Sequence, residues 1–491
     1  MSGHTVHERF QARVALHPER PALIQGSRAL DYAAVGKRVE ALAAQLAADG
    51  VVRGERVAVL AENCLEYLLV QLAAAHLGAM VACLNYRLTA GELADCLEQV
   101  EPRLLLHTEK FAELAKSAGG SLRRASLPDY VATAGQDCTQ VATGQPEDGL
   151  LIIFTSGTTG TPKAAVISQR AEVARMQVLQ RDLGLDEDDA FIAWAPMFHM
   201  GGSEHSLSSL MYGASVVVIE GLDAAAIVEA LVTRKVGWLL LVPATLEPVL
   251  EELRRRNQPV RGLKVVGCMA DMVSRSMIEA ICRATGAAFL NSFGSTETGL
   301  PPLSAGLLRA EQDTWDLGKR ANSDCELILR EATDGVGEML VRGPTLFSGY
   351  WREGGIDRSC LIDDAYPMGD LFRQRSDGLY EFAGRSKYLI KSGGENIYPA
   401  EIEGPLLADP RIEEAIVVRK PDERWGEVPV LFLATSDPSL AAAQVLAMLE
   451  PQLARYKLPR EVRFVKAAEL PRNTSGKVMR EQLEKWATIG P

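Results

Sequence analysis

A polar stretch between two apolar runs, FTSGTTGTPKAAV at positions 154–166, has the composition of a phosphate-binding loop. Its glycines let backbone N–H groups turn toward an anion, its hydroxyls add hydrogen-bond donors, and its lysine adds a positive charge. The candidate ligand-binding residues of this loop are Thr155, Ser156, Gly157, Thr158, Thr159, Gly160 and Lys163. This set of residues predicts nucleotide chemistry.

The loop does not have the spacing of the P-loop of ordinary NTPases. That motif requires a glycine, four residues, and then Gly-Lys followed by Ser or Thr. Here Pro162 precedes Lys163, and Ala164 stands where a magnesium-binding hydroxyl is needed. A mobile polar linker is the alternative reading. The apolar run LLIIF before the loop predicts a buried strand and AAVISQRAEVARMQVL after it predicts a helix, which favours a binding loop.

Length and composition indicate a multidomain globular protein. The 491 residues exceed one ordinary core, and 47% hydrophobic with 24% charged residues is average for a folded chain. The formal net charge of -12 disfavours nucleic acid or an anionic membrane as the main partner. The polar N-terminal stretch lacks the apolar centre of a secretory signal, so we expect a cytoplasmic protein without a membrane span.

The cysteines are scattered and none forms a CxxC pair, which predicts reduced core residues and neither a disulfide framework nor a zinc site. They are Cys64, Cys83, Cys96, Cys138, Cys268, Cys282, Cys325 and Cys360.

Apolar runs typical of strands and of helices alternate along the first 300 residues in two series, which predicts an α/β architecture with two helix-flanked sheets. After Pro301 shorter, turn-rich strands predict a small antiparallel or barrel-like unit. From about Arg385 a further series predicts a compact α+β unit of ordinary domain size. We therefore expect an N-terminal domain over 1–385 and a small mobile C-terminal domain over 386–491.

Six motifs lie in a fixed order along nearly the whole chain: FTSGTTGTPK, PMFHMGG, NSFGSTE, YPMGDLF, GRSKYLIKSGGENIYPAEIE and PRNTSGKVMR. Together they resemble the adenylate-forming, or AMP-binding, superfamily in its acyl-CoA synthetase branch. The resemblance implies an ATP-dependent carboxylate–CoA ligase that forms an acyl-AMP intermediate and releases pyrophosphate and then AMP. It also implies Mg²⁺ and coenzyme A as co-substrate. The first loop would then hold the phosphates that leave ATP.

The NSFGSTE motif would hold the nucleotide and the metal. By resemblance Phe293 stacks on adenine, although Tyr is commoner there, and Thr296 contacts the α-phosphate. Glu297 would hold Mg²⁺, a hard cation suited to one carboxylate plus phosphate oxygens. Asn291 and Gly294 complete the nucleotide contacts that this motif implies.

Asp370 of YPMGDLF lies between apolar residues, where a carboxylate is costly to bury unless it has partners. The ribose hydroxyls are such partners, and the resemblance adds Arg385 as a ribose or phosphate contact; a surface ion pair is the alternative for Arg385. Met368 replaces the usual Thr, which puts one minor phosphate contact in doubt.

Lys477 follows Gly476 in a polar stretch, where an isolated lysine is normally solvated. The resemblance makes it the catalytic lysine that approaches the carboxylate and the α-phosphate during adenylation. Lys387 would be the hinge between the domains. By the same resemblance Gly393 and Gly394 line the pantetheine tunnel, and Lys457 either serves the thiol donor or is a plain surface lysine.

The stretch PMFHMGGSEH is the most informative about the acid substrate. Amino-acid-activating relatives have an Asp at the position of His199, so an α-ammonium group would be buried without its partner. We expect an apolar acid without an α-amino group: aryl, alicyclic or a medium-chain fatty acid. His199 resembles the aromatic gate of acyl- and aryl-CoA ligases. The predicted pocket residues are Trp194, Met197, His199, Gly201 and Gly267.

Two alternatives stay open. The enzyme could pass its acyl group to a carrier protein, or the chain could be a non-catalytic nucleotide- or acyl-binding protein. The presence of Lys163, Glu297, Asp370, Arg385 and Lys477 argues against the second. A homodimer is also left open.

Overall fold

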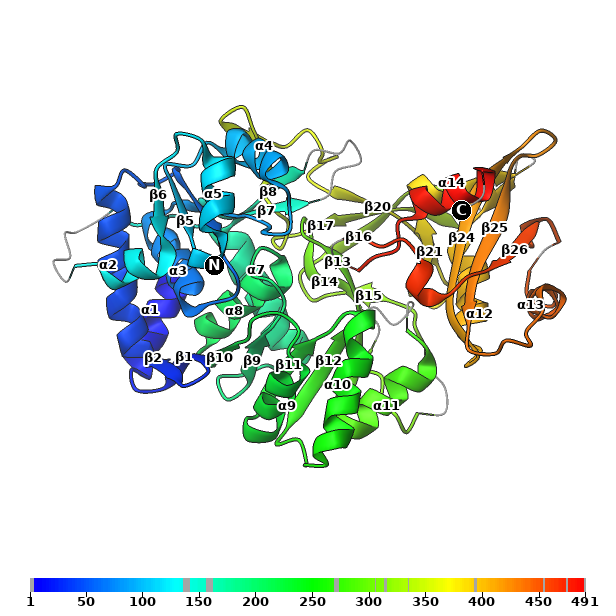
Figure 1. The fold of residues 1–491 in the computed structure, drawn as a ribbon, viewed down its shortest axis with the longest axis horizontal. Coiled ribbons are helices and arrows are strands. Elements are labelled where there is room, and N and C mark those ends of the chain that lie inside the picture. Colours follow the sequence, from blue (N-terminus) through cyan, green and yellow to red (C-terminus); the bar gives the residue numbers. More distant parts are fainter. Residues whose placement is uncertain are drawn as a thin grey trace.

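The chain forms an α/β fold with three sheets in its first 385 residues and a fourth sheet in its C-terminal part (Figure 1). The computed structural model describes residues 4–135, 142–155, 162–268, 273–304, 306–312, 316–333, 335–392, 395–453, 455–473 and 476–489. Seven predicted site residues lie outside these ranges: Ser156, Gly157, Thr158, Thr159, Gly160, Gly393 and Gly394. The predicted fold class is confirmed.

The first sheet has the strand order β19-β18-β8-β7-β4-β3-β5-β6. Its middle strands run parallel, as the alternation of strand and helix predicted, while β8 pairs antiparallel with β7. Its strands are β3 (Arg56–Leu60), β4 (Met80–Cys83), β5 (Leu104–His107), β6 (Arg124–Ser126), β7 (Gly149–Thr155), β8 (Lys163–Ser168), β18 (Gly349–Arg352) and β19 (Gly355–Asp357). The helices along this series are α3 (Leu65–Leu77), α4 (Ala90–Val100), α5 (Ala112–Gly119) and α6 (Leu127–Ala132).

The second sheet has the order β15-β14-β13-β12-β11-β9-β10-β1-β2, with parallel pairing from β13 to β1. Its strands are β1 (Pro21–Gln25), β2 (Arg28–Asp31), β9 (Ala190–Ala193), β10 (Val216–Val218), β11 (Val236–Leu240), β12 (Leu263–Cys268), β13 (Ala288–Ser295), β14 (Gly299–Ser304) and β15 (Arg320–Ala321). Three helices, α9 (Ala224–Thr233), α10 (Pro243–Arg256) and α11 (Arg275–Thr285), pack on this series. The N-terminal hairpin β1–β2 thus belongs to the second sheet, although the strands that follow it in the sequence form the first sheet.

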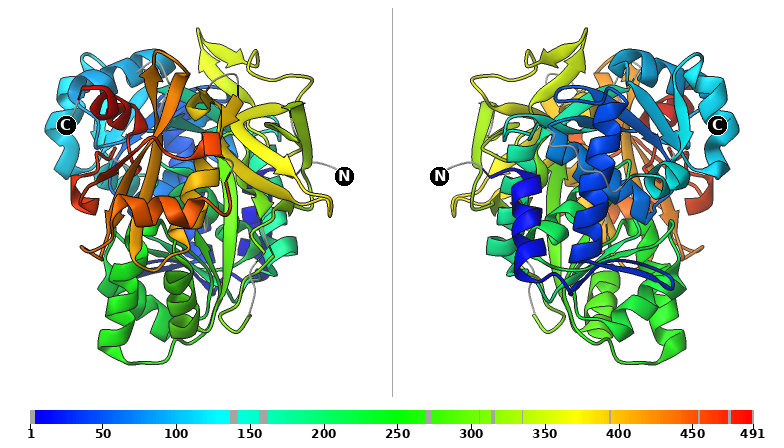
Figure 2. Two further views of the ribbon diagram at one scale, coloured as in Figure 1. Left: turned by 90° about the vertical axis from the view of Figure 1, so that its right-hand side faces the viewer. Right: turned by 90° about the vertical axis from the view of Figure 1, so that its left-hand side faces the viewer.

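Six helices contribute to the main core with the two sheets: α1 (Val6–Leu16), α2 (Tyr32–Ala48), α3, α6, α7 (Gln169–Leu183) and α8 (Met200–Tyr212). Two side views show α1 and α2 on the side remote from the C-terminal sheet (Figure 2). Helix α3 is buried along almost its whole length, which explains why its sequence is apolar all round. No helix among the described residues has both the length and the apolar character to cross a bilayer.

One element prediction is wrong. AAVIS does not begin a helix, because it forms β8 and pairs with β7, and α7 begins only at Gln169. A short apolar run fits a strand or a helix equally well by periodicity. Here the run becomes a strand because it pairs with the equally apolar β7. The pairing satisfies the backbone hydrogen-bonding groups of a run that is buried on both faces. The polar stretch therefore connects two strands and does not open a helix.

The third sheet, where the small antiparallel unit was expected, has the order β16-β17-β20-β21. Its strands are β16 (Glu326–Thr333), β17 (Val336–Arg342), β20 (Tyr366–Gln374) and β21 (Tyr380–Arg385). In Figure 1 it lies between the N-terminal sheets and the C-terminal part.

The fourth sheet has the order β23-β22-β25-β24, with β26 parallel to β25. Its elements are β22 (Ile390–Ser392), β23 (Glu395–Ile397), α12 (Pro399–Leu407), β24 (Ile412–Asp422), β25 (Gly426–Thr435), α13 (Ala442–Leu449), β26 (Glu461–Phe464) and α14 (Arg480–Ile489). It has its own apolar core. The boundary between 385 and 386 remains a prediction.

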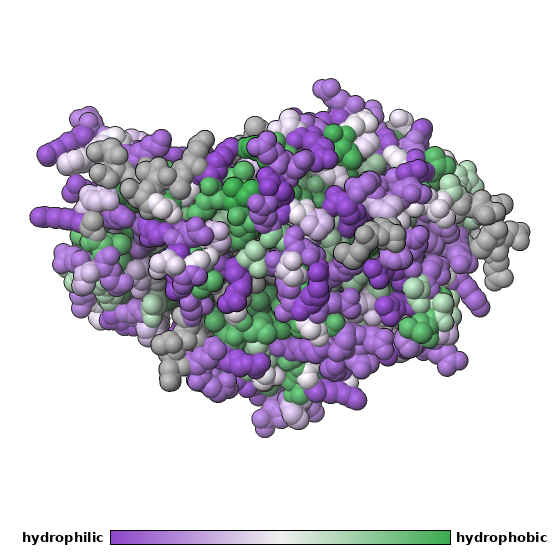
Figure 3. Space-filling view, turned by 180° about the vertical axis from the view of Figure 1, so that it is seen from behind, coloured by the Kyte–Doolittle hydropathy of each residue, from purple (hydrophilic) through white to green (hydrophobic). Residues whose placement is uncertain are grey.

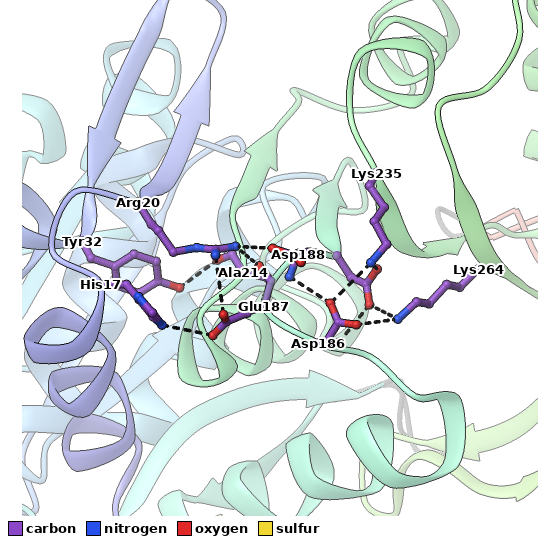
Figure 4. A network of polar contacts seen from close by, with 10 residues as sticks. His17, Arg20, Tyr32, Asp186, Glu187, Asp188, Ala214, Lys235 and Lys264 are labelled. Carbon is purple, nitrogen blue, oxygen red and sulfur yellow. Dashed lines mark hydrogen bonds and ion pairs between the residues drawn. The ribbon is translucent and has the colours of Figure 1, made fainter.

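An ionic network fixes the connection between α7 and β9 (Figure 4). Asp189, which is buried, contacts the ammonium groups of Lys264 at 2.5 Å and Lys235 at 3.1 Å. Arg20 reaches the same connection, 3.0 Å from Asp188. This connection therefore ties the N-terminal segment to the strands of the second sheet.

The surface seen from behind is mostly hydrophilic, with hydrophobic residues gathered in separate patches (Figure 3). Seven cysteines are free thiols, five of them buried, and Cys138 lies outside the described residues.

Candidate active site

The ends of the β7–β8 connection hold two predicted phosphate contacts opposite each other. Thr155 pairs with Lys163 across the two strands. The Lys163 ammonium lies 5.1 Å from the centre of the Tyr350 ring, a cation–π contact with β18. This contact places the charge of the loop beside the NSFGSTE motif, because Tyr350 also contacts Glu297.

Glu297, the predicted metal ligand, is buried at the end of β13. The Tyr350 hydroxyl donates a hydrogen bond of 2.7 Å to Glu297 Oε1, and the hydroxyls of Tyr350 and Tyr366 lie 3.1 Å apart. Burial and the nearby Glu297 raise the pKa of both phenols. These tyrosines therefore stay protonated and can act as donors to the carboxylate.

A buried arginine holds the backbone beside Glu297. Arg175 of α7 donates to the carbonyl of Thr296 at 3.1 Å and to that of Thr345 at 2.9 Å. Its third contact is the carboxylate of Glu204 on α8, at 2.5 Å, and both side chains of this pair are almost completely buried. Arg175 thereby links the helix that follows His199 to the predicted α-phosphate contact.

Phe293, the predicted adenine platform, packs at the edge of the third sheet. Its ring centre lies 5.1 Å from those of Phe372 and Phe382. Met368 belongs to the same apolar cluster. Of its neighbours on β13, Asn291 is buried and Gly294 is half-buried. The roles of these residues remain predictions.

Asp370 and Arg385 face each other across β20 and β21. Asp370 Oδ1 lies 2.6 Å from Arg385 Nε, but within the described ranges this buried oxygen accepts no aligned hydrogen bond. Burial raises the pKa of Asp370 to about 7, while Arg385 and Lys477 act in the opposite direction. A buried carboxylate oxygen that is ion-paired but accepts no aligned hydrogen bond can still accept one from a hydroxyl donor such as ribose.

Lys477 belongs to the C-terminal part, and its ammonium group interacts electrostatically with Asp370 and Arg385 of the N-terminal part. Displacement of water by the surrounding protein and the charge of Arg385 lower the pKa of Lys477, while Asp370 raises it. Lys477 is nevertheless an exposed residue. In Figure 1 the red segment before α14 extends toward β13 and β16. The domains are thus oriented with the predicted catalytic lysine at the nucleotide motifs.

His199 stands at the N-cap of α8 and is half-buried against Phe198, with 4.5 Å between the ring centres. Burial, Arg87 and Lys477 lower the pKa of His199 to about 4. The imidazole is therefore neutral at neutral pH, and two positive charges act on it.

Two other predicted lysines point elsewhere. Lys387 contacts Glu481 of α14 at 2.9 Å, and Lys457 contacts Glu401 of α12 at 2.6 Å. Both contacts lie within the C-terminal part. Neither lysine joins the group around Asp370 in this domain orientation.

The residues predicted for the acid pocket lie after β9, at the start of α8 and on β12. Trp194 donates its indole N–H to the carbonyl of Leu240 at 2.7 Å, and Met197 is buried in the main core. A Cβ atom at Gly201 would lie 2.8 Å from Leu240, and one at Gly267 would lie 2.4 Å from the indole nitrogen of Trp238. At Gly267 three atoms of the rigid indole lie this close, so the packing requires glycine there, whereas at Gly201 the close atom is the end of the flexible Leu240 side chain, which can move aside.

Comparisons with known proteins agree with this arrangement. The AMP-binding enzyme family matches residues 10–351, and the C-terminal domain of AMP-binding enzymes matches residues 401–477. The chain belongs to the AMP-binding enzyme family. An indoleacetate–CoA ligase from Aromatoleum aromaticum is 35% identical over 97% of each chain, and a 2-succinylbenzoate–CoA ligase from Bacillus cereus is 31% identical over 96% of this chain and 97% of that one.

Solved structures of family members show the same fold. The o-succinylbenzoate–CoA synthetase of Bacillus subtilis, in complex with its acyl-adenylate intermediate, matches with a TM-score of 0.84 at 27% identity, covering 97% of each chain. The same synthetase in complex with ATP and a magnesium ion matches equally well.

The side chains of this AMP-binding enzyme fit ATP and Mg²⁺. Asp370 offers an unsatisfied oxygen beside Arg385, and Lys163 and Lys477 supply positive charge. Within the described ranges no three His, Cys, Asp or Glu side chains gather as a metal cluster. A metal bound by Glu297 would therefore share its coordination with phosphate oxygens, the arrangement that Mg²⁺ commonly adopts.

Sequence reasoning missed Tyr350 and Arg175. Tyr350 lies in FSGYW, and its contact to Glu297 appears only once β18 pairs with β8. Arg175 is one polar residue in a helix. A charged residue on the buried face of a helix was the available signal.

Proposed function

We propose that this AMP-binding enzyme is an ATP-dependent carboxylate–CoA ligase. It forms an acyl-AMP with release of pyrophosphate and then transfers the acyl group to coenzyme A with release of AMP. The observation that carries this proposal is the approach of Lys477 from the C-terminal part to Asp370 and Arg385. A nucleotide bound by that pair would present its α-phosphate to the lysine ammonium.

Each side chain then has a defined task. The acid carboxylate attacks the α-phosphate, and the negative charge that grows there is met by the Lys477 ammonium, a point charge suited to the transition state. Asp370 orients the ribose, and Arg385 holds the Asp370 carboxylate. Glu297, oriented by Tyr350, provides the carboxylate for Mg²⁺, and Thr296 is fixed at its carbonyl by Arg175.

The electrostatics around His199 support an acid without an α-amino group. Arg87 and Lys477 both lower the pKa of His199, so the local potential is positive. A neutral imidazole in a positive potential would not stabilise a buried ammonium group. The indoleacetate and 2-succinylbenzoate that the relatives' names specify are aryl acids, which favours an aryl acid here.

Acid-dependent exchange of labelled pyrophosphate into ATP tests the first half-reaction across aryl, alicyclic, short-, medium- and long-chain acids. AMP release with and without coenzyme A tests the second. We expect exchange with an apolar acid and AMP release that depends on coenzyme A. ATP binding without exchange for any acid would contradict catalysis, and exchange without coenzyme A-dependent AMP release would indicate a carrier protein as acceptor.

A further inference from the structure

A cavity of about 740 Å³ lies at the start of β18, the end of this strand that is remote from the phosphate loop. Its lining comes from the first turn of α7, the connection from β17 to β18, β19 and the segment before β20. A volume of this size is ordinary for a small-molecule site. Among the described residues that line it, none belongs to the predicted nucleotide, acid or coenzyme A sites.

Three arginines from separate elements line this cavity. Arg170 lies in the first turn of α7, Arg342 ends β17, and Arg358 follows β19. The acids in the lining are Glu147 and Asp364, so three positive charges face two negative ones. The chain as a whole has a net charge of -12. A local excess of positive charge on an acidic protein favours the binding of anions.

The carboxylates that pair with these arginines are weakly held. Arg358 contacts Asp364 at 2.9 Å, and the Asp364 side chain is 81% exposed. Arg170 contacts Glu147 at 2.9 Å, and the Glu147 side chain is 72% exposed. Exposed ion pairs contribute little to stability. A ligand group with two negative charges can therefore replace both carboxylates, and planar guanidinium groups suit the oxygens of a phosphate.

Backbone carbonyls hold two of the guanidinium groups at the cavity. Arg342 donates from Nε at 3.2 Å and from Nη2 at 3.1 Å to the carbonyl of Asp363. Arg170 donates to the carbonyl of Pro344. The carboxylate partner of Arg342, Glu326, is itself exposed. Both positive charges therefore stay at the cavity when the exposed carboxylates move away.

Apolar side chains form another part of the lining. Leu346 and Phe347 are buried, while Ile356 is exposed and Leu361 is partly exposed. Small-molecule sites combine such apolar surface with a few polar groups that fix the orientation of the ligand. Together with the arginines, this surface favours an organic phosphate, whose ring or chain packs on the apolar side chains.

Phe347 connects the cavity to the predicted metal ligand. Its backbone N–H donates to the carbonyl of Glu297 at 2.8 Å. Its ring centre lies 5.0 Å from that of Tyr350 and 5.3 Å from that of Tyr366. Tyr350 in turn donates to the Glu297 carboxylate. A ligand that shifts Phe347 therefore acts on the backbone of Glu297 and on the phenol that orients its side chain.

We propose that this cavity is a second ligand site, which binds an organic phosphate. The dianionic phosphate group lies between the guanidinium groups of Arg170, Arg342 and Arg358. The ring or chain of the ligand lies on Leu346 and Phe347, and occupation of the site changes the affinity for MgATP. The site is independent of the acid that the enzyme activates, and only its effect on MgATP rests on the proposed function.

Binding of 1-naphthyl phosphate tests the site. Calorimetry is performed with MgATP at saturation and without an acid, so that the catalytic nucleotide site is filled. We expect 1-naphthyl phosphate to bind at least about tenfold more tightly than inorganic phosphate or 1-naphthol, because each of these offers only one of the two parts that the cavity recognises. Equal affinity for the three compounds, or no binding of 1-naphthyl phosphate, would overturn the inference.

Variants locate the bound compound. Arg342→Gln/Arg358→Gln removes two of the three positive charges and should weaken the binding of 1-naphthyl phosphate at least about tenfold. Arg103→Gln/Arg123→Gln is the matched control, because these arginines also form surface ion pairs but do not line the cavity. Its affinity should equal that of the wild type. Unchanged affinity in the test variant, as for binding in the predicted acid pocket, would also overturn the inference.

The effect on the catalytic site is measured as the Kd for MgATP with and without 1-naphthyl phosphate. We expect a change of about threefold or more in the wild type, matched by the same factor in the Kd for 1-naphthyl phosphate, and no change in Arg342→Gln/Arg358→Gln. A constant Kd would refute the coupling through Phe347. If the variant does not fold, the wild-type affinities for the three compounds still decide. Absence of exchange with all acids would refute the proposed function but not the second site.

Discussion

Arg373 of β20 and Glu401 of α12 form an ion pair with 2.9 Å between Nη2 and Oε1, and this pair connects the third sheet to the C-terminal part. The other carboxylate oxygen of Glu401 accepts from Lys457 at 2.6 Å. The same domain orientation brings Lys477 near Asp370. Glu401 thus makes one contact across the proposed domain boundary, to Arg373, and one within the C-terminal part, to Lys457.

Arg373→Met should shift the domains away from this orientation. The pair is partly exposed, so its loss should cost about 0.2–1 kcal/mol, and the adenylation rate should fall about two- to fivefold. Thioester formation from supplied acyl-AMP should be unaffected. Single-turnover rates of both half-reactions measure this. Arg375→Met is the control, because Arg375 pairs with Asp316 and Asp377 in the N-terminal part. Equal slowing by both variants would contradict a role of Arg373 in domain orientation.

Arg175→Met should be strongly destabilising. It leaves the Glu204 carboxylate buried without its partner, and the free energy of unfolding should fall by about 3–5 kcal/mol in a denaturant titration. The double variant Arg175→Met/Glu204→Leu removes both charges and should recover most of this loss. The adenylation rate of the double variant should remain below that of the wild type, because the Thr296 carbonyl has lost its donor. Full recovery of the rate would show that Arg175 does not position Thr296.

ATP binding should depend on the ionisation of Asp370. In the free enzyme its pKa is about 7, above the ordinary 3.8, so the carboxyl is protonated below neutral pH and cannot accept from both ribose hydroxyls. The KM for ATP should therefore fall about tenfold from pH 6 to pH 8. By linkage, protonated Asp370 favours the folded state, and this contribution to stability is lost as pH rises toward 7.

Asp370→Asn separates this effect from the titration of ATP itself, which is the same for both proteins. The variant should bind ATP more weakly than the wild type, and its KM for ATP should change less with pH. The ionisation of His199, with a pKa of about 4, lies below this range and adds no inflection. The same pH dependence in wild type and variant would refute the role of Asp370.

Much of the fold follows from local sequence patterns. Strands such as β3, β12 and β13 are short apolar runs between helical stretches, and the sequence predicts them because strand and helix alternate. The placement of β1 and β2 in the second sheet could not be predicted, since pairing partners far apart in sequence leave no local signal. The β7–β8 pairing was missed for a related reason, because AAVIS fits either type of element.

The residues of the candidate site also fall into a group that the sequence predicts and a group that it does not. Asp370, Arg385 and Lys477 lie in recognisable motifs, and the structure brings them together. Arg175, Tyr350 and Trp238 lie in stretches without a motif. Their importance arises from contacts between α7, α8, β11 and β18, which a single sequence does not specify.

Lys477 is proposed to serve adenylation and to leave the thioester step to another domain orientation. In Lys477→Ala both half-reactions should be measured on the same preparation. Acyl-AMP formation should fall by about a hundredfold or more, while thioester formation from supplied acyl-AMP stays near the wild-type rate. An equal loss in the two half-reactions, or an unchanged rate of acyl-AMP formation, would contradict it.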